Sequence, residues 1–385
     1  MNTTVGHLRS NYLQPTETFI YAYLAHAQKF KPFVITDVVQ NLSAFPAPCA
    51  CLLKKEEVDA FKTQMTPEKF RHFMRSFYKN LNYPTCFEYL IKERKINVLH
   101  AHFGTTGIQA LKLKKKLKIP LLTSFYGIDA SRHLSSKRMQ GAFKQLFQEG
   151  DLFSVLGKHM KNRLLTAGCP IQKIQILHLG VDLENIPFKT RMWPRNQGQI
   201  TMMYCGRLVE KKGIFFALEA FYHLSQQWPN LVFQIVGDGP LRNSVEHTIR
   251  KYQLQDRVQL KGMLSHSETL LAMQQAHIFI LPSITAKNGD QEGTPTVLME
   301  AQASGLPVVS TRHADIPEVV KHGKTGFLVP EKNSASLQHQ VNDLLKHPET
   351  WPSLGKSGRA HICRYYNIHR ETSKLEALYE SLIGI

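Results

Sequence analysis

Two carboxylates and the start of a helix stand close together near residue 290, and together they could bind a phosphorylated ligand. Glu292 lies in a predicted loop, and Glu300 lies about one turn inside the helix that follows, roughly 6 Å along its axis at ~1.5 Å per residue. Thr294 is a good N-cap residue, and Pro295 suits the first helical position. Unpaired N–H groups and the helix dipole favour a phosphate at such a start. Because proline has no N–H group, the usable donors are Gly293, Thr294, Thr296 and Val297.

These residue types suit a nucleotide sugar as the ligand. The amide groups and the dipole would hold its diphosphate, one carboxylate would accept hydrogen bonds from the sugar hydroxyls, and the other would accept them from the ribose diol. The spacing alone is also compatible with a capped helix and one solvated glutamate.

A cationic loop follows the first strand of the second half of the chain. Residues 206–213 join a predicted strand to a predicted helix, with glycines at both ends, Gly206 and Gly213. Arg207 and Lys212 are placed in this loop to neutralise a diphosphate that gains charge as it leaves. The alternative is a pair of solvated surface cations.

Further candidate residues lie at other strand ends. Gly237, in the turn 237–240, is a candidate neighbour of the nucleotide, and Lys261 and Gly262 could line a pocket for its base or phosphate. In the first half, His102 ends a strand and could hydrogen-bond a sugar hydroxyl, although a structural role is the alternative.

Two more polar residues, Tyr126 and Asp129, close the next strand and are expected to face the same way as His102. We expect no metal at this edge, because His100 and His102 have no carboxylate nearby in the sequence.

The elements that position these residues alternate between strand and helix. Strands are predicted at 3–8, 33–39, 97–102, 120–125, 152–156 and 173–179, and the alternation restarts at 200–205. This pattern predicts an α/β fold with two doubly wound parallel sheets in tandem, which bind ligands at the carboxyl ends of their strands, in the cleft between them. The expected parts are a first domain at 1–182, a proline-containing linker at 183–198, a second domain at 199–359 and a C-terminal helix at 360–385.

Composition is that of a globular protein, and the charge is unevenly distributed. The net charge is +18. Residues 1–190 hold 27 Lys and Arg against 13 Asp and Glu, whereas residues 191–385 hold 21 against 17. The basic first half favours an anionic partner, such as a membrane surface, nucleic acid or acidic saccharide. Scattered cysteines and the absence of a signal peptide or a membrane-spanning run predict a reducing, cytoplasmic location.

Two segments of the first half have open interpretations. Residues 54–93 are expected to be mostly helical, and their phenylalanines at helical spacing fit either a core or an acceptor groove. The basic run 111–118 fits either a solvated helix face or a contact with a membrane surface.

With these motifs placed, the sequence resembles the retaining glycosyltransferases of family 4, which have the GT-B fold, over nearly the whole chain. The most specific motif is E-x7-E, from Glu292 to Glu300, continued by Ala301, Gly305 and residues 307–311. The loop 206–213 is similar to the family's phosphate-binding loop. Residues 16–20, 100–103 and 178–182 resemble the exopolysaccharide and colanic-acid branch.

The resemblance implies a role for each matching residue. Glu292 would contact the hydroxyls of the donor sugar, Glu300 the ribose, Arg207 and Lys212 the diphosphate, and His102 the surroundings of the reacting sugar. The second domain would bind the nucleotide-sugar donor and the first domain the acceptor, with retained anomeric configuration and without a metal or other cofactor. The C-terminal helix would pack on the first domain.

Two departures from the family pattern lie on the acceptor or donor-sugar side. Tyr126 stands where relatives often have histidine in a T-F-H-G-x-D pattern, which here ends at Asp129. Residues 14–17 replace a glycine-rich loop, so Thr16 and Glu17 join the acceptor-side candidates. Both departures leave the identity of the sugar open.

We therefore predict a retaining glycosyltransferase that moves a sugar from a nucleotide-diphosphate sugar to a saccharide or lipid-linked acceptor in cell-surface or exported polysaccharide biosynthesis. The basic first domain adds an anionic membrane surface as a candidate partner, on the cytoplasmic face. An alternative keeps the fold but uses a soluble sugar, sugar phosphate or metabolite as acceptor. A second alternative is a non-catalytic anion-binding protein, but the sequence carries no nucleic-acid recognition motif.

Overall fold

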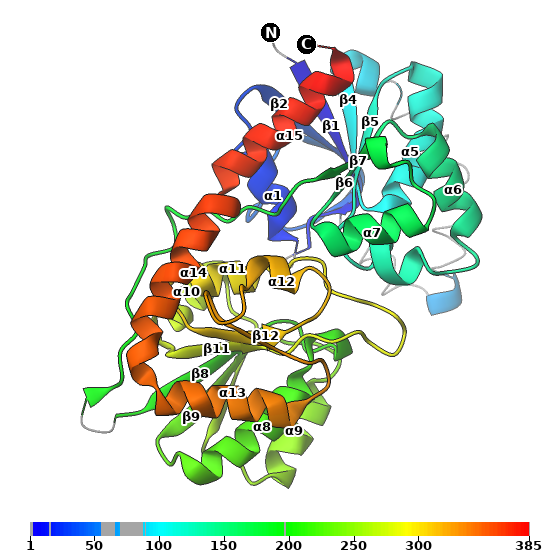
Figure 1. Cartoon of the computed structure of the whole chain (residues 1–385). Coiled ribbons are helices and arrows are strands. Elements are labelled where there is room, and N and C mark those ends of the chain that lie inside the picture. Colours follow the sequence, from blue (N-terminus) through cyan, green and yellow to red (C-terminus); the bar gives the residue numbers. More distant parts are fainter. Residues whose placement is uncertain are drawn as a thin grey trace. The chain divides into compact units, whose positions relative to one another are not determined.

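The computed structural model describes residues 3–14, 17–54, 66–69, 88, 90–195 and 198–384. The chain forms two compact units (Figure 1). Unit 1 comprises Met1–Gly180 and Ile368–Ile385, and unit 2 comprises Val181–Asn367. Each unit is built around a parallel sheet with helices between its strands, so the predicted α/β class is confirmed. Among the described residues, no helix is both long and apolar enough to span a membrane.

Unit 1 contains a parallel sheet with seven described strands in the order β3-β2-β1-β4-β5-β6-β7. Its strands are β1 (Thr3–Tyr12), β2 (Phe30–Val39), β3 (Cys49–Lys54), β4 (Ile96–His102), β5 (Leu121–Ser124), β6 (Leu152–Val155) and β7 (Ile174–Ile176). The order reverses direction at β1, because β2 and β3 lie on one side of it and β4 on the other. The sequence pattern did not predict β3.

Helices cover the sheet of unit 1 (Figure 1). They are α1 (Thr18–Ala25), α5 (Gly104–Leu117), α6 (Gln140–Glu149), α7 (Lys158–Thr166) and α15 (Ile368–Ile383). Helix α15 contacts α1 and β4, and α5 packs on β4, β5 and α6. One carboxylate fixes α15 to the sheet, because Glu376 accepts the backbone N–H groups of Gln28 and Lys29 at 2.8 and 2.6 Å.

Unit 2 contains a parallel sheet with six described strands in the order β10-β9-β8-β11-β12-β13. Its strands are β8 (Ile200–Cys205), β9 (Leu231–Val236), β10 (Val258–Gly262), β11 (Ile278–Leu281), β12 (Val308–Thr311) and β13 (Phe327–Val329). Its helices are α8 (Ile214–Gln227), α9 (Arg242–Lys251), α10 (His266–Gln275), α11 (Thr296–Ala303), α12 (Ile316–Val319), α13 (Ser334–Lys346) and α14 (Trp351–Tyr365). Every residue of β11 and β12 is buried, as expected for central parallel strands covered on both faces.

The segment 183–198 differs from the linker that its prolines and polar residues predicted. It belongs to unit 2, and its Arg191 is 2% exposed. The guanidinium donates to the carbonyl oxygens of Met273, Ala276 and Ser304 at 2.8, 2.9 and 3.1 Å. One buried arginine therefore anchors the segment to the ends of two helices, which composition alone does not reveal.

The C-terminal helical segment also differs from its predicted bounds. It consists of two helices, α14 in unit 2 and α15 in unit 1, so residues 360–367 are not part of the helix on unit 1. The break falls at Tyr366, whose carbonyl oxygen accepts the N–H of Val181 at 2.8 Å. Gly180 is required beside it, because a Cβ there would lie 2.5 Å from the Cα of Ile368.

Most of the aromatic segment 54–93 lies outside the described residues, and so do Phe61, Phe70, Phe73 and Phe77. That these phenylalanines form a core or an acceptor groove therefore stays a prediction.

Candidate active site

Three of the predicted glycines mark the carboxyl ends of the neighbouring strands β8, β9 and β10. Gly206 donates its N–H to the carbonyl of Val236 at 3.0 Å, and Gly237 donates to the carbonyl of Gly262 at 2.7 Å. Gly237 has φ +129°, and a Cβ there would lie 2.1 Å from the carbonyl oxygen of Gly206, so only glycine fits. The three loops that begin at these glycines therefore lie side by side at one edge of the unit 2 sheet.

Lys212 and Glu292, predicted on separate loops, meet at this edge. The Lys212 Nζ lies 2.7 Å from the Glu292 Oε1, and both side chains are largely buried. Ser283 donates its hydroxyl to the same carboxylate oxygen at 3.2 Å. Burial acts to raise the pKa of Glu292, but Lys212 and Lys211 outweigh it and lower the pKa to about 2. The carboxylate is therefore ionised and paired with a cation.

A second ion pair fixes the loop that carries Glu292. The Lys211 Nζ lies 3.1 Å from the Asp290 Oδ1 and 3.2 Å from the carbonyl oxygen of Gln291, to which it donates. The backbone carbonyl of Lys211 also accepts the N–H of Ile284 at 2.8 Å. The cationic loop and the Glu292 loop are thus joined by both main chain and side chains.

A buried histidine holds the main chain of Glu292 from the other side. The N–H of Glu292 donates to the His313 Nε2 at 3.0 Å, and the His313 Nδ1 lies 2.7 Å from the Glu331 Oε1. The sequence analysis missed both partners. A usable signal existed for His313, because it lies two residues after the end of β12, a buried strand whose carboxyl end faces the site.

Helix α11 begins differently from the sequence expectation. It starts at Thr296, with Pro295 at the N-cap position in an extended conformation (φ −68°, ψ 111°). The predicted N-cap role of Thr294 is therefore wrong, because this extended residue separates Thr294 from the first turn. The Thr294 Oγ1 is buried without a hydrogen-bond partner in the described part of the chain.

The predicted phosphate donors are nevertheless available at this helix start. The backbone N–H groups of Gly293, Thr294, Thr296 and Val297 donate no hydrogen bond to any described residue. Four amides with open donor capacity thus surround the first turn of α11, next to the carboxylate of Glu292.

Glu300 lies in the second turn of α11 and faces a histidine. The His266 Nε2 lies 3.0 Å from the Glu300 Oε1. The hydrogen bond to Glu300 raises the pKa of His266, against the opposing effect of burial. The two remaining cations predicted for the site, Arg207 and Lys261, are exposed and form no ion pair within the described residues.

In unit 1, His102 lies in a chain of neutral hydrogen bonds. Its Nδ1 lies 2.7 Å from the Tyr126 hydroxyl, and its Nε2 lies 3.0 Å from the Nδ1 of His7. His102 is completely buried, whereas Tyr126 is partly exposed. Tyr126 is therefore the member of this chain that reaches solvent. The sequence analysis missed His7, which lies opposite His100 on the neighbouring strand.

The neighbouring His100 extends this buried cluster. Its Nδ1 lies 2.6 Å from the Tyr379 hydroxyl on α15, and its Nε2 lies 2.7 Å from the Ser124 Oγ. Burial lowers the pKa of His7 to about 3, and it also lowers the pKa values of His100 and His102.

Ring nitrogens of His7, His100 and His102 all lie within 4.8 Å of one another, a spacing compatible with a metal. In the structure, however, both ring nitrogens of His100 and of His102 already face a hydroxyl or another imidazole. The three imidazoles and their hydroxyl partners thus form one buried hydrogen-bond network among the described residues.

The remaining acceptor-side candidates have structural partners. Asp129 is completely buried and accepts the N–H groups of Gly104, Tyr126 and Gly127 at 2.9, 3.0 and 3.0 Å. Its carboxylate shapes the backbone around Tyr126. Glu17 accepts two hydrogen bonds from the guanidinium of Arg9, at 2.6 and 3.1 Å.

Thr16, the other acceptor-side candidate, lies outside the described residues.

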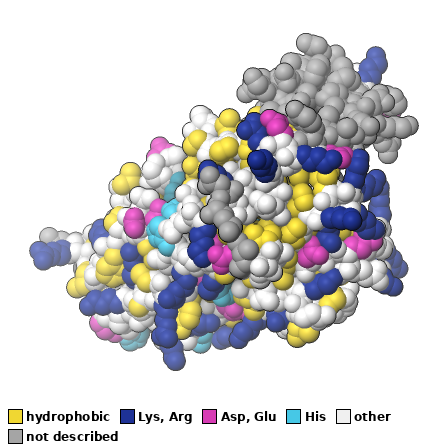
Figure 2. Space-filling view, turned by 90° about the horizontal axis from the view of Figure 1, so that it is seen from above, with side chains coloured by type: hydrophobic (Ala, Val, Ile, Leu, Met, Phe, Trp, Pro, Cys, Tyr) yellow, Lys and Arg dark blue, Asp and Glu magenta, His cyan; other side chains and the backbone are white. Residues whose placement is uncertain are grey.

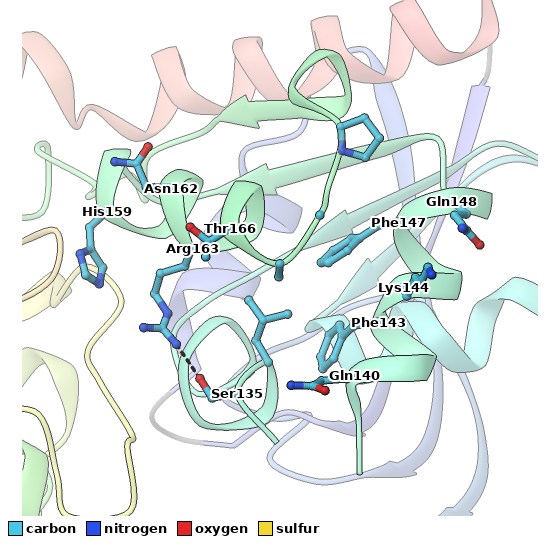
Figure 3. Close-up of a pocket in the computed structure, with 14 residues that line it drawn as sticks. Ser135, Gln140, Phe143, Lys144, Phe147, Gln148, His159, Asn162, Arg163 and Thr166 are labelled. Atoms are coloured by element: carbon cyan, nitrogen blue, oxygen red, sulfur yellow. Dashed lines mark hydrogen bonds between the residues drawn. The ribbon is translucent and has the colours of Figure 1, made fainter. Parts of the chain in front are cut away.

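A separate cavity of about 770 Å³ lies in unit 1 between α6 and α7 (Figure 3). None of the predicted site residues that the structure describes lines it. Its apolar lining includes Phe143 and Phe147 of α6, and its cationic lining residues are Lys144 and Arg163. Arg163 donates to the carbonyl of Ala130 and to the Ser135 hydroxyl, at 2.6 and 2.9 Å.

Comparison with known proteins identifies the family. A family model described as glycosyl transferases group 1 matches residues 185–361, and a model described as Glycosyltransferase Family 4 matches residues 47–185. The putative colanic acid biosynthesis glycosyltransferase WcaL of Salmonella typhimurium is 34% identical over 289 residues, which are 74% of this chain and 71% of WcaL. The amylovoran biosynthesis glycosyltransferase AmsK of Erwinia amylovora is 32% identical over 288 residues, 74% of this chain and 70% of AmsK. The chain belongs to glycosyltransferase family 4, and it is a glycosyltransferase.

Solved structures confirm the predicted GT-B fold. Anabaena Alr3699/HepE in complex with UDP and glucose superposes with a TM-score of 0.78 at 15% identity, over 99% of this chain and 100% of that one. Sucrose-phosphate synthase from Thermosynechococcus elongatus superposes with a TM-score of 0.75 at 16% identity, over 100% of both chains.

Proposed function

We propose that this glycosyltransferase moves a sugar from a nucleotide-diphosphate sugar to a saccharide or lipid-linked acceptor, with retention of the anomeric configuration and without a metal. It acts in the biosynthesis of a cell-surface polysaccharide, a role supported by its similarity to WcaL and AmsK. The observation that carries the proposal is the Lys212–Glu292 ion pair, which lies beside the open amides of α11.

The donor would reorganise this ion pair when it binds. Its diphosphate would accept hydrogen bonds from Lys212, Arg207 and the amides at the start of α11, because all of these carry positive charge or unpaired N–H groups. Glu292, released from Lys212, would then accept hydrogen bonds from the sugar hydroxyls. Glu300 would exchange His266 for the ribose diol.

The same groups support transfer on one face of the sugar. The acceptor oxygen forms a bond to the anomeric carbon while the bond from that carbon to the diphosphate oxygen breaks on the same face. The leaving phosphate takes the acceptor proton. Lys212, Arg207 and the helix amides stabilise the charge that develops on the phosphate, a role that a metal fills in other enzymes.

The first experiment is a thermal-shift and hydrolysis screen with UDP-, GDP- and ADP-sugars. UDP-glucose is tested first, because Alr3699/HepE has been crystallised with UDP-glucose. A Glu292→Gln variant should retain the fold and lose transfer. Proton NMR of the product checks the anomeric configuration, and assay in EDTA checks metal independence. Inverted product, or activity that returns only with added metal, would contradict those parts of the proposal.

For the acceptor, we favour one presented at an anionic lipid surface over a soluble one. The cavity between α6 and α7 supports this choice, because Lys144 and Arg163 line it together with apolar rings, and no carboxylate is among its described lining residues. The basic run on α5 is a weaker candidate, since Lys114, Lys115 and Lys116 pair with Asp151, Glu149 and Glu88. Figure 2 shows Asp and Glu side chains between the Lys and Arg side chains of the face that it presents.

Sedimentation with phosphatidylglycerol vesicles at low and high salt tests this choice. Lys144→Glu should weaken binding, whereas Lys346→Glu on α13 serves as a control with the same charge change. Absence of salt-sensitive binding would favour the soluble acceptor.

A further inference from the structure

Glu331, His313 and the main chain of Glu292 form a three-membered relay in unit 2. The His313 imidazole is completely buried between a carboxylate at 2.7 Å and a backbone N–H at 3.0 Å. The other carboxylate oxygen of Glu331 accepts the N–H of Thr285 at 2.7 Å. The relay therefore ties down both the start and the end of the loop that carries Glu292.

The chemistry of these groups fixes the histidine tautomer. A backbone N–H can only donate, so the Nε2 of His313 must offer its lone pair to Glu292. The proton of a neutral imidazole then sits on Nδ1, which donates to Glu331. The carboxylate thus orients the imidazole, and the imidazole orients the amide next to the Glu292 side chain.

The hydrogen bonds to Glu331 stabilise its charged form. Burial acts to raise the pKa of Glu331, but the N–H of Thr285 and the ring of His313 outweigh burial and lower it. An ionised carboxylate is the stronger acceptor, and it holds the Nδ1–H tautomer in place.

We propose that His313 and Glu331 are positioning residues for sugar transfer, which hold the Glu292 backbone so that its carboxylate meets the donor sugar. This inference rests on the proposed role of Glu292. Neither residue needs to touch the substrate. The side chain of Glu292 already has its own partners, Lys212 and Ser283, so the relay supplies the missing constraint on the main chain.

The test compares two substitutions at His313 with one matched control. His313→Leu removes the acceptor of the Glu292 N–H, whereas His313→Gln keeps a carbonyl oxygen that can replace Nε2. His277→Leu is the control, because His277 also accepts a backbone N–H in this unit, that of Thr201 at 3.1 Å, at the opposite ends of the strands.

We expect kcat for UDP-glucose turnover to fall about 100-fold in His313→Leu, the loss typical of a small misplacement. UDP binding should change little, since UDP lacks the transferred sugar that Glu292 is proposed to bind. His313→Gln should recover part of the activity, and His277→Leu should resemble the wild type. Hydrogen exchange should become faster in the peptide that contains residues 285–293 of His313→Leu, and not in His277→Leu. Nitrogen NMR of labelled histidine should show the Nδ1–H tautomer.

The outcomes separate this inference from the proposed function. If Glu292→Gln retains turnover, the role of Glu292 falls and the positioning role falls with it. If Glu292→Gln is inactive but His313→Leu keeps its kcat, the positioning inference alone is overturned. Unchanged hydrogen exchange at residues 285–293 would also overturn it, whatever the donor. If His313→Leu does not fold, Glu331→Gln and His313→Gln provide the same comparison.

Discussion

The two units place polar groups at the same edge of similar sheets, yet they build opposite electrostatic environments. In unit 2, the strand ends carry an ionised carboxylate and a lysine at 2.7 Å, and the pKa of Glu292 is lowered to about 2. In unit 1, burial lowers the pKa of His102, and its ring faces a hydroxyl and another neutral imidazole. The difference follows from fixed charge: Lys212 offsets the desolvation of Glu292, whereas no opposite charge among the described residues stabilises a protonated His102.

This contrast suits two parts of one reaction. A charged edge can exchange its internal ion pair for a diphosphate, because a new anion replaces the old one. A neutral network can orient hydroxyl groups without binding an anion. We therefore expect substitutions in unit 2 to lower the rate of catalysis strongly. Substitutions in the unit 1 network should instead lower stability and activity to a similar extent.

The largest expected effect is the loss of sugar transfer in the Lys212→Ala variant. Removing a group that is proposed to stabilise the leaving phosphate should lower kcat/KM by about 1,000-fold, the upper range for loss of one such donor. Steady-state release of the nucleotide measures it. Lys287→Ala, an exposed lysine in the segment before Asp290, should stay near the wild-type rate. Near-wild-type turnover in Lys212→Ala would contradict the diphosphate role of Lys212. The proposed catalytic difference between the two units would then be lost.

The second effect is on folding stability and comes from the ion pair between Lys212 and Glu292. Lys212→Ala leaves Glu292 buried without its cation and should lower the free energy of unfolding by about 3 kcal/mol. The double variant Lys212→Met with Glu292→Gln should recover most of this loss, because neither partner is then charged. Urea unfolding measures both. Equal losses in the single and double variants would show that the pair contributes through packing.

The pH dependence of that pair has a defined sign. The folded pKa of Glu292, about 2, lies below the unfolded value of roughly 4.3. The contribution is therefore fully present above the unfolded pKa and is lost as pH falls toward the folded pKa. Urea unfolding between about pH 5 and pH 2.5 should show a smaller acid-dependent loss in the double variant than in the wild type. Identical slopes would contradict the ionised, paired state of Glu292.

A smaller effect is expected in the neutral network of unit 1. Tyr126→Phe removes the hydroxyl that faces the His102 Nδ1 and leaves a buried ring nitrogen unpaired, which should lower the free energy of unfolding by about 1–2 kcal/mol. Tyr365→Phe, an exposed tyrosine of α14, is the control. A loss of activity without any loss of stability would show that the Tyr126 hydroxyl acts on the substrate, the role proposed for the charged groups of unit 2.

The same contrast explains how far sequence reasoning reached. Strand and helix alternation predicted both sheets, and strand ends located Gly206, Gly237 and Gly262 because parallel strands end at one edge. The pairing of Lys212 with Glu292 was not predicted, because it depends on how two loops fold toward each other. His313 and His7 were missed for a similar reason. Each contacts residues that are distant in the sequence and that only the folding of the sheet brings close. The Thr294 cap was wrong because the backbone at Pro295 is extended.

The smallest effect concerns His266, which lets unit 2 respond mildly to pH. The hydrogen bond to Glu300 raises the pKa of His266, and Asp182 adds to that effect. A raised pKa means that the pair is present at low pH and is lost as pH rises through that value. Since Glu300 is proposed to bind the ribose, protonated His266 competes with the nucleotide. UDP affinity should therefore increase about threefold between pH 6 and pH 8, in line with the small contribution of exposed ion pairs.

His266→Ala should remove this pH dependence of UDP affinity. The control is His339→Ala, which should keep it, because His339 pairs with Asp343 at 3.3 Å on α13. Calorimetric titration with UDP measures each slope, and a wild-type slope in His266→Ala would assign the pH response to another group.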